Sequence, residues 1–121
     1  MSHTQNRQDL RERTKAFALR IIKMYSSLPK SSVAQILGKQ VLRSGTSVGA
    51  HYREAYRSRS TAEFISKIEV GLQELEETVY WFDLLVDSNV FSKKRLTNLQ
   101  KEAEELIAIF TSVVIKVKKR K

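Results

Sequence analysis

The chain repeats apolar residues at alternating intervals of three and four positions, and it does so in four separate segments. This spacing places the apolar side chains on one face of an α-helix, because a helix completes a turn about every 3.6 residues. The third segment has the clearest pattern and follows a heptad without interruption. Its predicted core positions are Ile65, Ile68, Leu72, Leu75, Val79, Phe82 and Val86.

The other three segments have the same kind of apolar face. The first comprises Leu10, Thr14, Phe17, Ile21, Met24 and Leu28, the second Ala34, Leu37, Val41, Ser44, Val48, His51 and Ala55, and the fourth Leu96, Leu99, Ala103, Leu106, Phe110, Val113 and Val117. Long helices joined by short loops pack as antiparallel neighbours. The sequence therefore predicts an all-α fold, an antiparallel up-down-up-down four-helix bundle. It forms a single domain over residues 1–121, with flexible tails at 1–7 and 118–121.

Turn and capping residues separate the four segments. The first helix is expected to end at Leu28, because the residue before a proline is displaced from the helical conformation. Ser60 followed by Glu63 has the spacing of a capping box, which predicts the start of the third helix. The predicted N-caps of the second and fourth helices are Ser31 or Ser32 and Ser92.

The second helix contains a stretch of small residues at 44–50, with the sequence SGTSVGA. Its two glycines each lower helix propensity by roughly 1 kcal/mol relative to alanine. One interpretation is a loop that splits the helix, and the other is a continuous helix that a neighbour approaches closely. We favour the continuous helix, because the apolar register runs through to Ala55 without a change of phase.

Composition argues against several kinds of site. The chain has no cysteine, so it forms neither disulfides nor thiolate–zinc sites. Its two histidines are His3 and His51, and neither belongs to the Glu-x-x-His pairs of a di-iron bundle. His51 lies on an apolar stripe, where we expect a hydrogen-bonded core residue. We therefore expect no metal, no cofactor, no small-molecule substrate and no enzymatic activity.

The sequence also bears on location. No apolar run reaches the roughly 18 residues of a membrane span. The N-terminal sequence MSHTQNRQDLRERTK is polar and charged, unlike a secretory signal. We expect a cytoplasmic protein with no membrane partner.

Three short motifs resemble those of a known family. Residues 47–55, SVGAHYREA, resemble an S-I-x-x-N-I-x-E-G signature, with His51 in place of the asparagine and Ala55 in place of the final glycine. Residues 57–64 are similar to an R-x-S-x-x-E-F element, and residues 71–76 to G-S-L-x-E-L-E. All three are typical of the bacterial four helix bundle proteins, also called the large-subunit ribosomal RNA intervening-sequence protein family.

This resemblance has implications for assembly and partners. It implies an up-down-up-down bundle that forms ring-shaped homopentamers. It also implies kinship with the accessory protein of diversity-generating retroelements, a basic pentamer that binds nucleic acid and a reverse transcriptase. In this sequence the third helix is apolar on more than one face, which predicts buried surface between subunits. The predicted interface residues are Phe64, Tyr80 and Trp81.

Basic residues are concentrated at one end of the predicted bundle. The 22 Lys and Arg residues outnumber the 13 Asp and Glu residues, for a formal net charge of +9. In an antiparallel bundle, the N-termini of the first and third helices lie at the same end as the C-termini of the second and fourth. That end, the basic pole, contains 13 basic and four acidic residues and so holds the whole excess. Besides Lys67, its basic residues are the predicted nucleic-acid-binding set: Arg7, Arg11, Arg13, Lys15, Arg53, Arg57, Arg59, Lys116, Lys118, Lys119, Arg120 and Lys121.

Two interpretations of the basic pole stay open at this point. Cations near helix C-termini complement the helix dipole, which accounts for part of the 116–121 cluster but for little of the cluster at 7–15. The other interpretation is contact with an anion, either nucleic acid or an acidic protein. Tyr52 and Tyr56 lie near these arginines, and they either stack on bases or fill the core or an interface.

Overall fold

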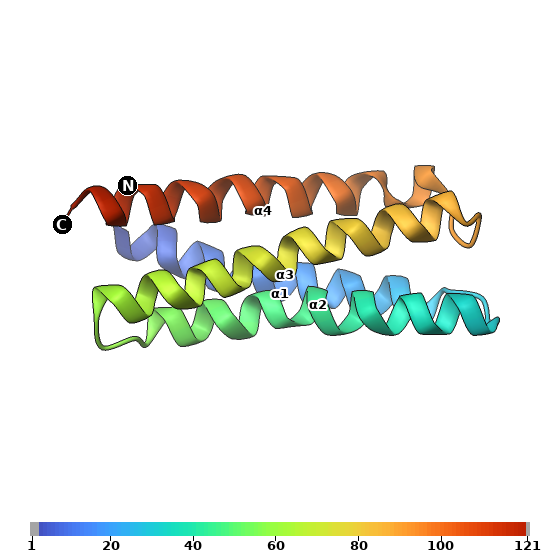
Figure 1. The fold of residues 1–121 in the computed structure, drawn as a ribbon, viewed down its shortest axis with the longest axis horizontal. Coiled ribbons are helices and arrows are strands. Elements are labelled where there is room, and N and C mark those ends of the chain that lie inside the picture. Colours follow the sequence, from blue (N-terminus) through green and yellow to red (C-terminus); the bar gives the residue numbers. More distant parts are fainter. Residues whose placement is uncertain (1–2, 121) are drawn as a thin grey trace.

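Four long helices make up the structure, a computed structural model that describes residues 3–120, with side chains from Leu10 onward. They are α1 (His3–Ser26), α2 (Ser32–Tyr56), α3 (Thr61–Asp87) and α4 (Lys93–Lys119). The helices run alternately in opposite directions along one axis (Figure 1). This confirms the predicted all-α, up-down-up-down bundle.

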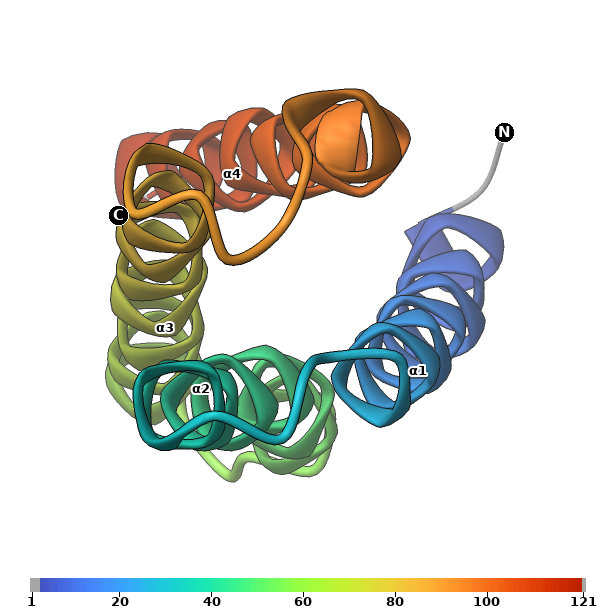
Figure 2. The ribbon, with the colours of Figure 1, turned by 90° about the vertical axis from the view of Figure 1, so that its right-hand side faces the viewer.

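The helices are arranged in a ring in the order of the chain (Figure 2). α2 packs against α1 and α3, and α3 packs against α4, whereas α1 and α4 make much the sparsest contact of the neighbouring pairs. The start of α1, the 57–60 connection and the end of α4 lie at one end of the bundle (Figure 1). The 27–31 and 88–92 connections lie at the other end.

Serine side chains begin three of the helices, as predicted. Ser31 Oγ accepts a hydrogen bond from Ala34 N at 3.2 Å, and Ser60 Oγ accepts one from Glu63 N at 3.0 Å. Ser92 Oγ caps α4 in the same way, from Arg95 N at 3.3 Å. α1 ends at Ser26, two residues before the predicted end.

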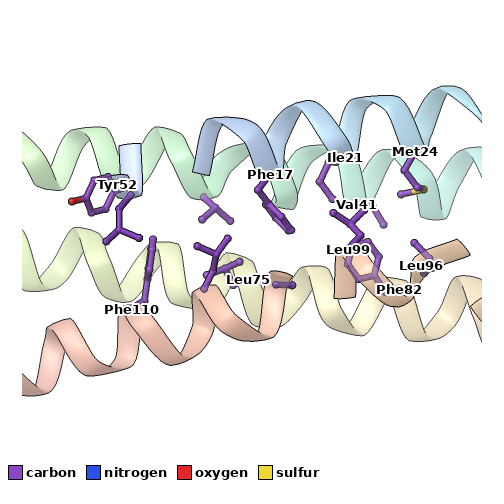
Figure 3. Close-up of a cluster of buried hydrophobic side chains, with 14 of the residues drawn as sticks. Phe17, Ile21, Met24, Val41, Tyr52, Leu75, Phe82, Leu96, Leu99 and Phe110 are labelled. Atoms are coloured by element: carbon purple, nitrogen blue, oxygen red, sulfur yellow. The ribbon is translucent and has the colours of Figure 1, made fainter. Parts of the chain in front are cut away.

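The core runs along the axis between the four helices, and all six predicted positions of α1 are buried. Large side chains from all four helices meet there (Figure 3). Tyr52 and Phe110 pack at the end nearer the basic pole, with ring centroids 5.9 Å apart. Most of the predicted stripes of α2 and α4 are likewise buried.

The predicted heptad of α3 is wrong at three positions. Leu72, Val79 and Val86 are only partly buried, and the residues that precede them, Gly71, Thr78 and Leu85, face the core instead. A Cβ atom at residue 71 would lie 2.9 Å from the ring of Phe110, so the glycine provides the space that this ring occupies. Near the end of α4, Val114 is similarly buried in place of Val113.

α2 is continuous through its small residues, which confirms the favoured interpretation. Two of its buried glycines face α1: a Cβ atom at Gly45 would lie 2.8 Å from Ile21 Cγ1, and one at Gly38 would lie 3.0 Å from Tyr25 Cδ1. The small residues therefore allow α1 to approach closely.

The tails predicted at 1–7 and 118–121 fall mostly within helices, since α1 begins at His3 and α4 ends at Lys119. Met1, Ser2 and Lys121 lie outside the described residues. Within the part of the chain that the structure describes, no helix has the length and apolar character needed to cross a membrane.

Candidate nucleic-acid interface

Three arginines from the end of α2 and the following connection form the centre of the basic pole. Arg53, Arg57 and Arg59 are all exposed. Among residues 10–120, none of the three forms an ion pair. Their charges therefore face solvent without a compensating carboxylate among those residues.

Arg11 of α1 lies beside this group of arginines, because it contacts the last turn of α2. Its guanidinium carbon lies 4.7 Å from the centroid of the Tyr56 ring, in a cation–π contact. Tyr56 is partly buried at the last turn of α2, whereas Tyr52, one turn earlier, is a core residue. The open choice between stacking and core is thus resolved for Tyr52, and Tyr56 keeps an accessible surface.

Two hollows flank Tyr56. The larger, of about 420 Å³, is lined by the 58–61 segment, Ala55, Tyr56, Phe64, Val117 and Arg120. The smaller, of about 230 Å³, is lined by Arg11, Arg53, Glu54, Tyr56 and Arg57. Every cation that lines either hollow is an arginine.

The remaining predicted residues divide into exposed and paired groups. Lys15, Lys116 and Lys119 are exposed. Lys118 Nζ lies 3.2 Å from Glu69 Oε2 in the first half of α3, so the charge of this lysine is paired within the chain. The side chain of Arg7 and the whole of Lys121 lie outside the described residues.

Arg13 is turned away from the pole and joins α1 to α4. Its Nε and Nη2 atoms donate to Glu102 at 2.8 Å each, and Nη2 also donates to Glu105 at 2.8 Å. The hydrogen bonds to Glu102, and secondarily those to Glu105, raise the pKa of the guanidinium above its usual value, against the effect of burial. The charge of Arg13 is compensated within the chain.

His51 takes part in a polar cluster between α2 and α3 and is only partly buried, so the expectation of a core position is corrected. Its Nδ1 lies 3.1 Å from Glu54 Oε1, and Lys67 Nζ lies 3.4 Å from the same oxygen. The hydrogen bond with His51, followed by the charge of Lys67, lowers the pKa of Glu54. Glu54 is the only carboxylate among the described residues that line the smaller hollow, and His51 and Lys67 are its partners.

The three predicted interface residues lie in two places along α3. Phe64 lines the larger hollow at the basic pole. Tyr80 and Trp81 lie about 24 Å further along α3, with their rings in edge contact at 5.1 Å. Trp81 Nε1 donates to Glu77 Oε1 at 3.1 Å, and Tyr80 is 55% exposed.

Two features of the structure were not predicted from the sequence. Val33 and Ile36 near the start of α2 are exposed, at 53% and 64%, because they fall outside the apolar stripe of that helix. The place of Phe64 in the larger hollow was also not predicted. No group of carboxylates and histidines within the described residues has the arrangement of a metal site.

Comparisons with known proteins bear on the whole chain. The model of the family described as 23S rRNA-intervening sequence protein matches residues 6–112. The crystal structure of a protein of unknown function from the S23 ribosomal protein family of Bacteroides thetaiotaomicron VPI-5482 is similar, with a TM-score of 0.84 and 31% sequence identity. The match covers 89% of this chain and 96% of that one. Among curated proteins, none matches. The chain therefore belongs to the 23S rRNA-intervening sequence protein family.

Proposed function

We propose that this protein is a non-enzymatic, cytoplasmic nucleic-acid-binding protein that contacts RNA or DNA through its basic pole without reading their sequence. One observation carries the proposal: Arg53, Arg57 and Arg59 are exposed together at one end of the bundle, with no ion pair among residues 10–120. Arginine matches the planar, bidentate geometry of phosphate oxygens. Contacts of this kind fix position on the phosphate backbone and carry no base information.

The helix dipole alone is a weaker account of these charges. A dipole attracts cations only to the last turn of a helix. Arg53 and Arg57 lie in the last turn and at the C-cap of α2, where the dipole favours them. Arg59, however, lies beyond that cap, and Arg11 belongs to the first half of α1. Their placement supports an external anionic partner.

The test compares two triple variants that lose the same number of charges. Arg53, Arg57 and Arg59 are replaced by glutamine in one, and Lys23, Lys30 and Lys39, exposed residues nearer the other end, are replaced in the control. Binding of a fixed-length RNA and a DNA is measured by fluorescence anisotropy over a series of salt concentrations. A plot of log K against the logarithm of the salt concentration has a negative slope, and each lost phosphate contact makes that slope shallower by about 0.7 to 0.9. We expect the arginine variant to lose roughly 2 to 3 from that slope and the lysine variant to change little.

Two results contradict the proposal: equal losses in the two variants, or affinity that is independent of salt. Circular dichroism shows whether each variant keeps its helical content. An acidic protein partner is the alternative, and capture of such a protein by the wild-type chain but not by the arginine variant, without any nucleic-acid binding, would support it.

We also propose that the protein assembles with itself, as the family resemblance implies, in rings of five copies. Exposed Tyr80 with its neighbour Trp81, and exposed Val33 and Ile36, support the presence of a subunit contact remote from the basic pole. Light scattering at micromolar concentration is expected to give the mass of five chains. A monomer at that concentration would reject the ring, and a dimer would reject the number five.

A further inference from the structure

The two hollows at the basic pole share one lining residue, Tyr56. Arg11 covers the ring at 4.7 Å in a cation–π contact and lines the smaller hollow. The larger hollow adds a second aromatic side chain, Phe64, with Ala55 and Val117 beside it. Aromatic and apolar surface therefore lies directly among the arginines.

Phosphate binding alone does not require such surface. Backbone contacts are made by guanidinium, hydroxyl and amide groups, among them the hydroxyl of tyrosine, and the ring of a phenylalanine has no group that donates to a phosphate. Bases, in contrast, stack on aromatic faces and on guanidinium planes when they are unstacked from their neighbours. The bases of a duplex are stacked on each other and cannot enter a hollow, whereas those of a single strand can turn outward.

The sizes of the two hollows suggest a division of roles. Pockets that hold small ligands begin at about 300 Å³. The larger hollow, at about 420 Å³, exceeds this size, and the smaller one, at about 230 Å³, does not. The larger hollow thus has the volume for a base, and the three arginines of the smaller one suit an adjacent phosphate.

A third hollow, near the other end of the bundle, provides a comparison. It lies between α1 and α4, measures about 390 Å³, and is lined by Arg20, Lys23 and Arg95. Its aromatic residue, Phe91, is only 7% exposed and is covered by Arg95 at 4.3 Å from the ring centroid. The larger hollow and this third one are therefore similar in volume, and cations line both. They differ because Tyr56 and Phe64 are only partly buried, whereas Phe91 is buried.

We propose that the basic pole selects single-stranded nucleic acid, with one unstacked base held in the larger hollow between Tyr56 and Phe64 and its backbone phosphates on the surrounding arginines. This inference rests on the proposed function and adds the substrate class to it. It predicts preference for an exposed base, with no requirement for a particular base.

The experiment uses the full chain and three fluorescent probes with equal numbers of phosphates. They are a single-stranded polyuridine oligonucleotide, the same backbone with abasic residues, and a duplex. Stacking of one base on an aromatic residue corresponds to roughly a 5- to 150-fold gain in affinity. We expect the single strand to bind more tightly than the abasic strand by a factor in that range, and more tightly than the duplex.

Matched variants locate the effect. Phe64→Leu keeps an apolar side chain in the larger hollow but removes the ring, and Phe91→Leu makes the same change in the third hollow, near the other end of the bundle. Phe64→Leu should lower affinity for the single strand towards that of the abasic strand and leave the abasic affinity unchanged. Phe91→Leu should change neither.

A measurement on the unmodified chain keeps the test independent of whether Phe64→Leu folds. A single strand that contains 4-thiouridine is photo-crosslinked to the protein, and the attachment sites are mapped by mass spectrometry. Crosslinks to Tyr56, Phe64 or the 58–61 segment support the inference, and crosslinks confined to other surfaces overturn it. If all three probes bind equally and with salt dependence, the inference fails while the proposed function stands. If no probe binds, both fail.

Discussion

Thr78 of α3 and Ser44 of α2 join the two central helices through a hydrogen bond of 2.7 Å between their hydroxyl oxygens, and both side chains are fully buried. Each oxygen also lies near a carbonyl of its own helix, Thr78 near Glu74 O at 2.7 Å and Ser44 near Gln40 O at 2.9 Å. Two hydroxyl protons serve these three contacts, so one proton lies between the hydroxyls and the other points to a carbonyl. The pair is a polar link within an otherwise apolar seam.

Removal of either hydroxyl from this pair should by itself break the hydrogen bond between α2 and α3. Thr78→Val and Ser44→Ala each remove one partner, and each should lower the free energy of unfolding by roughly 1 to 2 kcal/mol. The double variant leaves no hydroxyl without its partner on the other helix and should lose less than the sum of the two. Urea denaturation of the four proteins measures the coupling, and strictly additive losses would show that the bond contributes nothing.

Three leucines test the register of the core. Leu75 and Leu106 are fully buried, and replacement of either by alanine should cost roughly 2 to 5 kcal/mol of unfolding free energy. Leu72 is only partly buried, so Leu72→Ala should cost distinctly less. Thermal and urea denaturation give the comparison. A loss at Leu72 equal to that at Leu75 would favour the unbroken heptad over the observed register.

The difference between the predicted and observed registers of α3 has a physical cause. Apolar spacing identifies Leu72 and Val79, because each is a large apolar residue that directly follows a small or polar one, Gly71 or Thr78. Gly71 and Thr78 are buried because of their partners on other helices, the ring of Phe110 and the hydroxyl of Ser44. Helix positions, N-caps and the order of the bundle follow from local sequence. The choice between adjacent core positions depends on side chains that lie far away in the sequence.

The same distinction applies to the basic pole. Its location at one end follows from antiparallel topology and was predicted. The ion pairs of its residues were not predicted, because they depend on which positions of neighbouring helices lie side by side. Lys118 of α4 pairs with Glu69 of α3, and Arg13 of α1 pairs with Glu102 of α4. The hollows around Tyr56 have no signature in apolar spacing or in net charge.

Gly45 should be intolerant of even a methyl group. Gly45→Ala raises helix propensity by about 1 kcal/mol, but the new Cβ would lie 2.8 Å from Ile21 Cγ1, and such overpacking typically costs about 1 to 3 kcal/mol. We expect a net loss of roughly 1 kcal/mol of unfolding free energy in urea denaturation.

A second background distinguishes contact from propensity at this glycine. The three atoms nearest to the new Cβ all belong to Ile21, and Ile21→Ala removes all of them. In that background Gly45→Ala should therefore become stabilising. If Gly45→Ala stabilises the protein with Ile21 present, close approach of α1 is not the reason for the glycine.

Arg13 provides a test of the revised charge distribution. Its side chain and that of Glu102 are 28% and 16% exposed, and their two parallel hydrogen bonds hold α1 to α4 along the seam with the sparsest contact. Arg13→Gln should lower the free energy of unfolding by about 1 kcal/mol, near the upper end for partly exposed pairs, and the loss should shrink at high salt.

Since Glu102 and Glu105 occupy the guanidinium, Arg13 makes no phosphate contact, and Arg13→Gln should leave the salt slope of nucleic-acid binding unchanged. Arg57→Gln, in contrast, should lower that slope by about 0.7 to 0.9. Equal losses of slope in the two variants would mean that Arg13 releases its glutamates to bind phosphate.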